Sequence, residues 1–419
     1  MDESRGIPSL LSLKTSKNIW NQKQSIMHIA MMLCVVPLEI LGYISWGLRL
    51  CIYVIRMFVF FYTVWMLLKS KSKLEHLSVF LLVGNYAVVS VVTLINPNHD
   101  FQALASLFAT ALPLFFFVDY IFSVSRQYGT FVMGTALKIL CVLNFILIFI
   151  FPKGLVPWHT QIMYLFAYRN SNFAPYFVLS FLVLIEAYDR KQHLDLEAFL
   201  WMMLGLVNFY CVKSVTALFL QTILILLSVL VFGKRPLLKP RIWMVYTTIG
   251  IIALLLIFNV QKQFNWLFEL FSRDSSFTGR TQIWQQAIDA FVKKPILGYG
   301  IEKLEVLNQH FFNDHEALST AHNYYLELLY EGGVVAFSLF TVLNVHIIRI
   351  LSKQKQTSLV WVTNCVLFCL FLNFFVETYP RMQLLLVIFI IVERMFAPPD
   401  PELVKTVAPR PATQVENVS

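Results

Sequence analysis

Residues 214–232 read S-V-T-A-L-F-L-Q-T-I-L-I-L-L-S-V-L-V-F and contain no charged side chain. A helix needs about 20 consecutive apolar residues to cross a bilayer, and this run meets that length. It also lacks the apolar–polar alternation of a transmembrane barrel strand. Since only helices and closed barrels satisfy the backbone in lipid, this run predicts a membrane-spanning helix.

The whole chain is similarly rich in apolar residues and poor in charged ones. Hydrophobic residues make up 58% of its 419 residues and charged residues 14%. Soluble domains carry about 45–50% apolar and about 25% charged residues. A single buried core cannot hold this excess, because cores stop growing near about 250–300 residues. The composition therefore predicts an all-α polytopic membrane protein.

The apolar runs predict about twelve transmembrane helices by the length that a bilayer requires. They lie at 26–46, 49–68, 77–95, 102–123, 129–151, 172–188, 196–212, 214–232, 242–259, 324–348, 358–376 and 382–396. Eleven or thirteen spans remain alternatives, since the sixth, seventh and twelfth runs are short and the first two nearly touch.

Charge sets the orientation. The formal net charge is +9, but Lys and Arg cluster in short segments between apolar runs, which is typical of membrane topology and not of nucleic-acid binding. Most of them fall on the side of the N-terminus, so we expect both termini to be cytoplasmic. The expected domains are a cytoplasmic segment 1–25, membrane helices 26–259, a large extracytoplasmic catalytic loop 260–322 with short helices, membrane helices 323–397, and a disordered cytoplasmic tail 398–419.

Several function classes have no support. The six cysteines lie in or beside apolar runs without a C-x-x-C pair, so we interpret them as small hydrophobic residues and expect no metal site. The sequence lacks Walker, G-x-G-x-x-G and H-E-x-x-H patterns, and no cofactor is expected. ATP-driven transport by this chain alone is unsupported.

The chemistry-bearing residues gather around the long loop. It reads F-T-G-R-T-Q-I-W at 277–284, K-K-P-I-L-G-Y-G at 293–300 and A-H-N-Y-Y-L-E-L-L-Y-E-G-G-V-V at 321–335. Residues 280–294 predict an amphipathic surface helix that lies on the protein or on the membrane interface. Gly332 and Gly333 predict a close helix contact.

These three segments together resemble the O-antigen ligase/Wzy-type polysaccharide polymerase superfamily. The resemblance implies metal-independent glycosyl transfer from undecaprenyl-diphosphate-linked glycan at the outer face of the bacterial cytoplasmic (inner) membrane. The acceptor would be a glycan or lipid A-core, and a chain-length regulator protein is a further candidate partner. The leading interpretation is polymerisation of oligosaccharide repeat units into O-antigen, capsule or exopolysaccharide.

Two residues are the candidate catalytic groups. Arg280 offers a fork of donors that matches the oxygens of a diphosphate leaving group. His322 is the candidate base, because histidine as a residue type exchanges protons near neutral pH, and the matching family histidine is tied to acceptor activation. Asn323, Glu327 and Glu331 could orient His322, or could be ordinary interfacial polar residues. Asn323 and Glu327 are also candidates for substrate binding.

Other cations are candidates for substrate binding. Arg169 lies in Y-R-N-S-N-F-A-P, which is similar to a family segment, Lys213 precedes Ser214 at the mouth of a span, and Arg381 ends E-T-Y-P-R. Each could instead be a charge that snorkels to the interface. The chain departs from the family pattern at Val215, where relatives carry Arg, and Lys213 lacks the bidentate fork to replace it. We expect His310 and His315 to be bystanders.

Three alternatives stay open. An O-antigen ligase would use the same loop to transfer glycan to lipid A-core. A flippase of lipid-linked sugars would need charges within the spans, where Arg56 and Lys138 are among the few. A sensor or scaffold would bind sugar without turnover.

Overall fold

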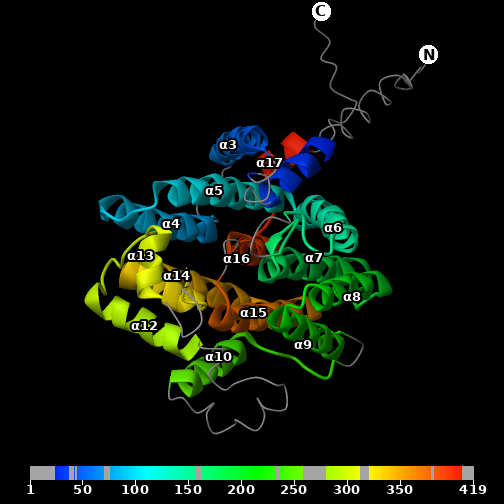
Figure 1. Ribbon diagram of the computed structural model, residues 1–419. Helices are drawn as coiled ribbons and strands as arrows, with labels where there is room; N and C mark the ends of the chain where they lie inside the picture. Colours follow the sequence, from blue (N-terminus) through cyan, green and yellow to red (C-terminus); the bar gives the residue numbers. More distant parts are fainter. Residues whose placement is uncertain are drawn as a thin grey trace, which may run out of the picture.

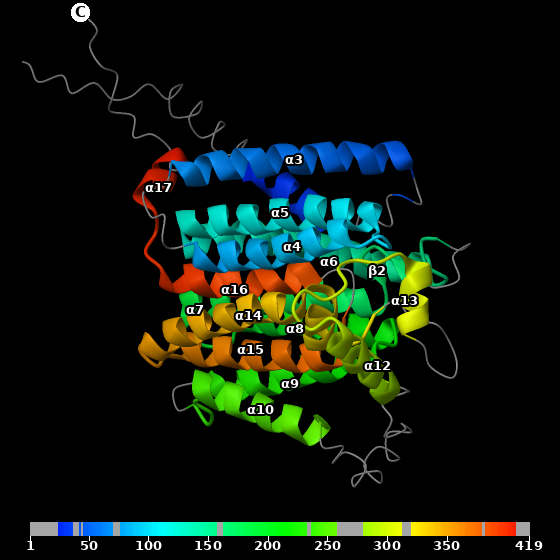
Figure 2. The ribbon, with the colours of Figure 1, turned by 90° about the vertical axis from the view of Figure 1, so that its left-hand side faces the viewer.

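The computed structural model describes residues 24–36, 42, 45–69, 76–156, 162–232, 236–257, 280–311, 320–378 and 382–407. Within these ranges the chain forms a bundle of long helices that run side by side along one direction (Figures 1 and 2). After the helix Gln24–Val35 come α3 (Trp46–Leu68), α4 (Leu77–Ile95), α5 (Phe101–Val124), α6 (Arg126–Ile150), α7 (Phe173–Lys191), α8 (Leu196–Cys211), α9 (Val215–Val231) and α10 (Ile242–Ile257). The second half holds α12 (Arg280–Lys293), α13 (Leu304–His310), α14 (Tyr324–Lys353), α15 (Ser358–Val376), α16 (Met382–Phe396) and α17 (Pro401–Val407).

Seven of these helices are long and apolar enough to cross a membrane, among the residues that the structure describes: α3, α4, α5, α6, α7 (extended from Asn170), α14 and α15. Shorter apolar helices are Gln24–Val35, α8, α9 and α10. The predicted helical, polytopic class is confirmed, and each expected span overlaps a described helix. The number twelve, the orientation and the domain limits stay predictions. The first expected span, 26–46, is described as a helix only as far as Val35.

The bundle is built around α16. Its residues Met382–Met395 are all buried, between α5, α7, α4 and α14 (Figure 1). In contrast, α3 lies at the edge and exposes large apolar side chains such as Phe58 and Trp65. Exposed apolar surface of this size suits contact with lipid. The apolar helices therefore include a protein-buried centre, α16, and an outward-facing rim helix, α3.

A small irregular region precedes α7. The strands β1 (Met163–Tyr164) and β2 (Ala167–Tyr168) pair antiparallel, and the 3-10 turn η1 (Asn170–Asn172) leads into the helix. This hairpin was not expected from the sequence. It fixes the entry to α7, where the predicted Arg169 segment lies.

The two glycines at 332–333 interrupt α14. Gly333 has φ 59° and ψ −160°, which is not helical. A Cβ there would lie 2.3 Å from the carbonyl oxygen of Ile296, and one at Gly332 would lie 3.2 Å from Val89 of α4. The predicted close contact is present, but at Gly333 it is made with the loop 294–300 and not with a helix. Glycine is required because a side chain would collide and because φ is positive.

The loop 294–300 supplies hydrogen bonds that the break in α14 removes. A helix break frees carbonyl and amide groups, which must find partners when buried. The N–H groups of Tyr299 and Gly300 donate to the carbonyls of Tyr330 and Glu331, both at 2.8 Å, and Val334 N–H donates to Pro295 O at 2.8 Å. The P-I-L-G-Y-G turn and the G-G pair therefore form one structural unit.

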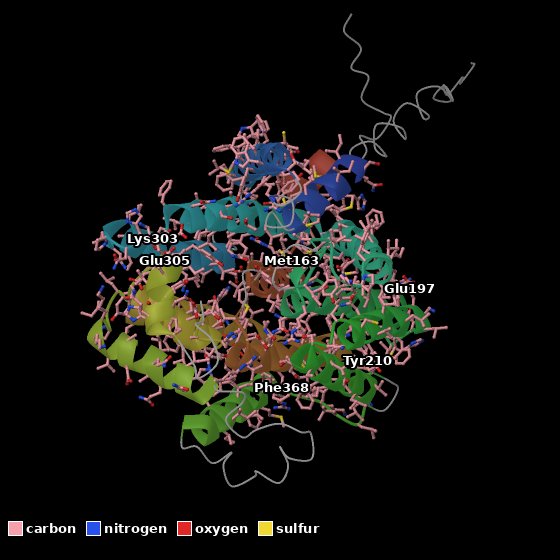
Figure 3. The ribbon with its side chains drawn as sticks, viewed as in Figure 1. Met163, Glu197, Tyr210, Lys303, Glu305 and Phe368 are labelled. Atoms are coloured by element: carbon pink, nitrogen blue, oxygen red, sulfur yellow. The ribbon has the colours of Figure 1, made fainter. Side chains whose placement is uncertain are left out.

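Residues 301–303, directly after this loop, bond to the turn between α4 and α5. Lys303 N–H donates to Asn98 O, and Asp100 N–H donates to Ile301 O, both at 3.0 Å. The buried Glu302 carboxylate accepts from the Asn96 amide at 2.8 Å. Figure 3 shows Lys303 and Glu305 together where α13 meets the end of α4. The described part of the expected loop is thus held at one end of the bundle.

Candidate functional site

Three side chains from distant segments, Arg280, His322 and Glu377, meet at the end of the bundle that carries α12 and α13. Arg280 lies at the start of α12, His322 just before α14, and Glu377 just after α15. Glu377 is buried and lies at the centre, because both other side chains face its carboxylate. The two residues predicted to be catalytic are therefore brought together by a third that was not predicted.

Arg280 is fixed in place by the end of α15. Its Nη2 lies 2.8 Å from Oε1 of Glu377, and its Nη1 donates to the carbonyl of Val376. Two partners on one guanidinium restrict its rotation. The side chain keeps 20% of its surface exposed, so it is also accessible to a ligand. The arrangement gives a preorganised cation at the edge of the site.

His322 is held by both of its neighbours in the sequence. The N–H of Ala321 donates to Oε2 of Glu327 at 2.7 Å. Asn323 caps α14, since its Oδ1 accepts from Tyr325 N–H at 3.0 Å and from Leu326 N–H at 3.1 Å. The Asn323 amide also donates to the carbonyl of Phe375 at 3.2 Å.

These bonds hold the backbone of His322 at φ 49°, a left-handed conformation that is uncommon for a residue with a side chain. Such conformations persist only where the surroundings impose them, and they cluster at functional sites. Asn323 and Glu327 therefore bond to the backbone on either side of His322. That they orient its side chain or contact substrate stays a prediction.

The imidazole of His322 faces Glu377 through a buried nitrogen. Nδ1 lies 3.9 Å from Oε2 of Glu377 and has no hydrogen-bond partner among the described residues. Burial raises the pKa of Glu377, but the neighbouring His322 and the Arg280 cation together outweigh burial and hold the pKa below its usual range. The carboxylate is therefore ionised and completes an Arg–Glu–His cluster.

Asn170 and Ser214 extend this cluster to α7 and α9. The Asn170 amide nitrogen lies 3.4 and 3.5 Å from the two Glu377 oxygens, and its Oδ1 accepts from the Ser214 hydroxyl at 3.1 Å. The predicted cations Arg169 and Lys213 each directly precede one of these residues. Both side chains are exposed, and neither forms an ion pair with any part of the chain that the structure describes. They are available to an anionic ligand beside the cluster.

The remaining predicted residues divide as follows. Arg381 and His315 lie outside the described residues. His310 lies 4.0 Å from Glu302 on α13, in the loop anchor and not in the cluster. Val215 is the exposed first residue of α9, directly after Ser214.

Sequence reasoning missed Glu377, Asn170 and Ser214. One signal was available for Glu377: it is an acidic residue directly after the apolar run 358–376, at the same end of the bundle as the motif loop. Asn170 lay inside the segment quoted for Arg169. The described ranges contain no group of three or more His, Cys, Asp or Glu side chains that could hold a metal ion.

Part of this sequence is similar to sequences of known proteins. The family model described as O-Antigen ligase matches residues 198–341, which include Lys213, Arg280 and His322. The exopolysaccharide production protein ExoQ of Rhizobium meliloti (strain 1021) is 30% identical over 99 residues, which cover 20% of this chain and 23% of that relative. The match thus spans about a quarter of the relative's length. No solved structure matches the chain.

Both matches fall on a multi-pass membrane protein whose motif residues lie in one cluster. The matched family and the named relative belong to polysaccharide biosynthesis, which is the class that the loop motif predicted. With the shared segment at residues 198–341, the chain's resemblance to the O-antigen ligase/Wzy-type polysaccharide polymerase superfamily is confirmed.

Proposed function

We propose that this protein polymerises undecaprenyl-diphosphate-linked oligosaccharide repeat units into a surface polysaccharide, by metal-independent glycosyl transfer at the outer face of the cytoplasmic membrane. The observation that carries the proposal is the convergence of Arg280 and His322 on Glu377. A general base and a fixed cation are the two groups that displacement of a diphosphate by a sugar hydroxyl needs.

His322 acts as the base in this scheme. Because Nδ1 is buried and faces Glu377, Nε2 is the nitrogen that accepts the proton of the acceptor hydroxyl. The carboxylate stabilises the imidazolium that forms, as an acidic partner does for catalytic histidines in general. The acceptor oxygen then forms a bond to the anomeric carbon of the donor while the bond from that carbon to the diphosphate oxygen breaks. Direct displacement inverts the configuration of this carbon.

Arg280 stabilises the departing lipid diphosphate. Its contacts with Glu377 and Val376 fix it before substrate arrives, so no reorganisation is needed during the reaction. The exposed Arg169 and Lys213 supply further positive charge for the same group. Arg381 keeps its assignment as a fourth candidate cation. Lipid bilayer, glycan acceptor and a chain-length regulator protein are the proposed partners.

The ligase reaction is the second candidate. The description of the matched family, O-antigen ligase, favours it directly. The named relative, described as an exopolysaccharide production protein, favours polymerisation. Both reactions share the donor and leaving group, and they differ in the acceptor, which is lipid A-core for the ligase.

The test is complementation of a polysaccharide-deficient strain with wild type, Arg280→Ala and His322→Ala, read on a gel that resolves chain length. A polymerase gives a ladder with wild type, whereas both variants accumulate single lipid-linked repeats at normal protein levels. Ladders that stay on the carrier in the variants identify a ligase. Variants that behave as wild type overturn the site and favour a transporter of lipid-linked sugars.

A further inference from the structure

The helix α12 has two apolar faces, and within the part of the chain that the structure describes only one of them is covered by protein. Ile283, Ala287 and Ala290 are buried against Tyr299, Phe311 and Tyr330 in a small core beside α14. This face explains why the helix docks on the bundle. Other apolar side chains of the same helix lie outside this small core.

The second face lies next to the first and is exposed. Ile288 and Val292, four residues apart on one side of the helix, are 41% and 66% exposed. Ile296 and Leu297 continue the apolar surface beyond the end of the helix, with 67% and 46% exposure. Gln285 and Asp289 border this face, since Gln285 and Val292 are seven residues, or about two turns, apart. Gln282 and Gln286 form the polar side of the helix and are half-buried. A helix on a water-exposed loop has no reason to carry so much uncovered apolar surface.

Two cations adjoin this face. Lys293 and Lys294 are exposed between Val292 and Ile296, and the Lys294 ammonium lies 4.3 Å from the centre of the Tyr299 ring. Apolar side chains flanked by lysines are typical of helices that lie in the headgroup region of a membrane. The charge complements anionic phosphates and not a second basic protein surface.

The position of α12 suits the same partner. It lies on the outside of α14 at the edge of the bundle (Figure 1). In Figure 2 it lies toward the end of the bundle at which α3 and α5 begin. This end corresponds to the boundary between hydrocarbon and headgroups.

We infer that the face formed by Ile288, Val292, Ile296 and Leu297 inserts into the lipid leaflet at this end of the bundle, with Lys293 and Lys294 on anionic headgroups. Such helices bury their apolar side about 5–10 Å into the boundary of headgroups and acyl chains. The loop helix thus rests on protein with one face and on lipid with the other.

The contact has a consequence for the site. Because α12 begins at Arg280, a membrane anchor along the helix fixes the height of that guanidinium above the bilayer. A lipid-linked diphosphate is confined to that height. This consequence rests on the proposed function, whereas the lipid contact itself does not.

Spin labels on single cysteines test the contact in the full-length protein. Cys51 is exposed and Cys211 half-buried, and the other four cysteines are buried, so Cys51→Ser with Cys211→Ser gives the background. Labels are placed by Ile288→Cys and Val292→Cys, with Gln282→Cys and Gln286→Cys as matched controls on the polar side. The protein is reconstituted in vesicles of phosphatidylethanolamine and phosphatidylglycerol, and the accessibility of each label to oxygen and to a water-soluble nickel complex is measured.

A lipid contact gives a severalfold higher ratio of oxygen to nickel accessibility at 288 and 292 than at 282 and 286. Equal ratios at all four positions overturn the inference. Labels at 288 and 292 that neither reagent reaches also overturn it, and identify protein as the cover. In vesicles of phosphatidylcholine alone the ratio at 292 falls, and an unchanged ratio overturns the role of the lysines. These outcomes do not depend on catalytic activity.

Discussion

Arg280 and Glu377 form an ion pair, with Nη2 of the arginine 2.8 Å from Oε1 of the glutamate, although 97 residues separate them in the sequence. The pair joins the motif loop to the end of α15. The same carboxylate faces His322 at 3.9 Å. One buried acid therefore pairs with one proposed catalytic group and faces the other.

Replacing this acid tests that relationship. We expect Glu377→Gln to reduce turnover by about 100-fold or more, because loss of a functioning base costs that much and the neutral amide cannot stabilise an imidazolium. Protein levels should stay near normal. The matched control is Glu305→Gln on the exposed side of α13, which should keep nearly full activity. Equal activity of the two variants would remove Glu377 from the mechanism.

The ion pair also predicts how stability depends on pH. Because the pKa of Glu377 is lowered in the folded protein, it lies below the value of about 4.3 expected for the unfolded chain. Its contribution is therefore complete above about pH 4.3 and is lost as the pH falls through the folded-state pKa. Thermal midpoints measured in detergent between pH 7 and pH 3 should fall more steeply for wild type than for Glu377→Gln. Parallel curves would contradict this prediction.

Variants of the two exposed cations test substrate binding without disturbing folding. Arg169 and Lys213 have no ion-pair partner among the described residues, so Arg169→Ala and Lys213→Ala should change the free energy of unfolding by less than about 0.5 kcal/mol. If they bind the diphosphate, the KM for the lipid-linked donor rises. Arg169→Lys should recover part of the loss, since it restores charge without the planar fork. A KM that is unchanged in both alanine variants would assign these side chains to the interface alone.

The cap of α14 gives a test of how His322 is positioned. Asn323→Ala removes the acceptor for Tyr325 and Leu326 and should cost about 1 kcal/mol of stability. Asn323→Asp keeps the acceptor but loses the donor to Phe375. We expect Asn323→Asp to be the more stable of the two variants, by thermal unfolding, and both to lose activity if the contact with Phe375 matters. An Asn323→Asp variant with full activity would show that the cap alone suffices.

The sequence predicted the parts of this molecule that depend on neighbouring residues. Apolar runs of bilayer length located the helices, and a contiguous motif located Arg280, His322 and their loop. Contacts between distant segments were not accessible in this way. Asn170 and Glu377 are 207 residues apart and meet only because α7 and α15 pack in one bundle. The break at Gly333 was also missed, because a glycine pair inside an apolar helix predicts close packing as readily as it predicts a kink.

That break supports the last prediction. Gly298 and Gly333 both have positive φ, at 70° and 59°, and a Cβ on either would lie 2.3 Å from a backbone carbonyl oxygen, of Tyr330 and of Ile296 respectively. A left-handed conformation costs a residue with a side chain about 1–2 kcal/mol, and the collision adds to it. We expect Gly298→Ala and Gly333→Ala each to lose at least about 2 kcal/mol of stability and to lose activity, since the displaced loop carries α12 and Arg280.

Gly134 provides the matched control, because it lies inside α6 and a Cβ there would meet no atom within 4 Å. Gly134→Ala should be neutral or stabilising by about 0.5–1 kcal/mol, as expected where glycine is not required. The measurements are thermal unfolding and turnover of Gly298→Ala, Gly333→Ala and Gly134→Ala. Should Gly298→Ala behave like Gly134→Ala, the docking of the loop on the broken helix does not hold the site together, and the ion pair of Arg280 with Glu377 must do so alone.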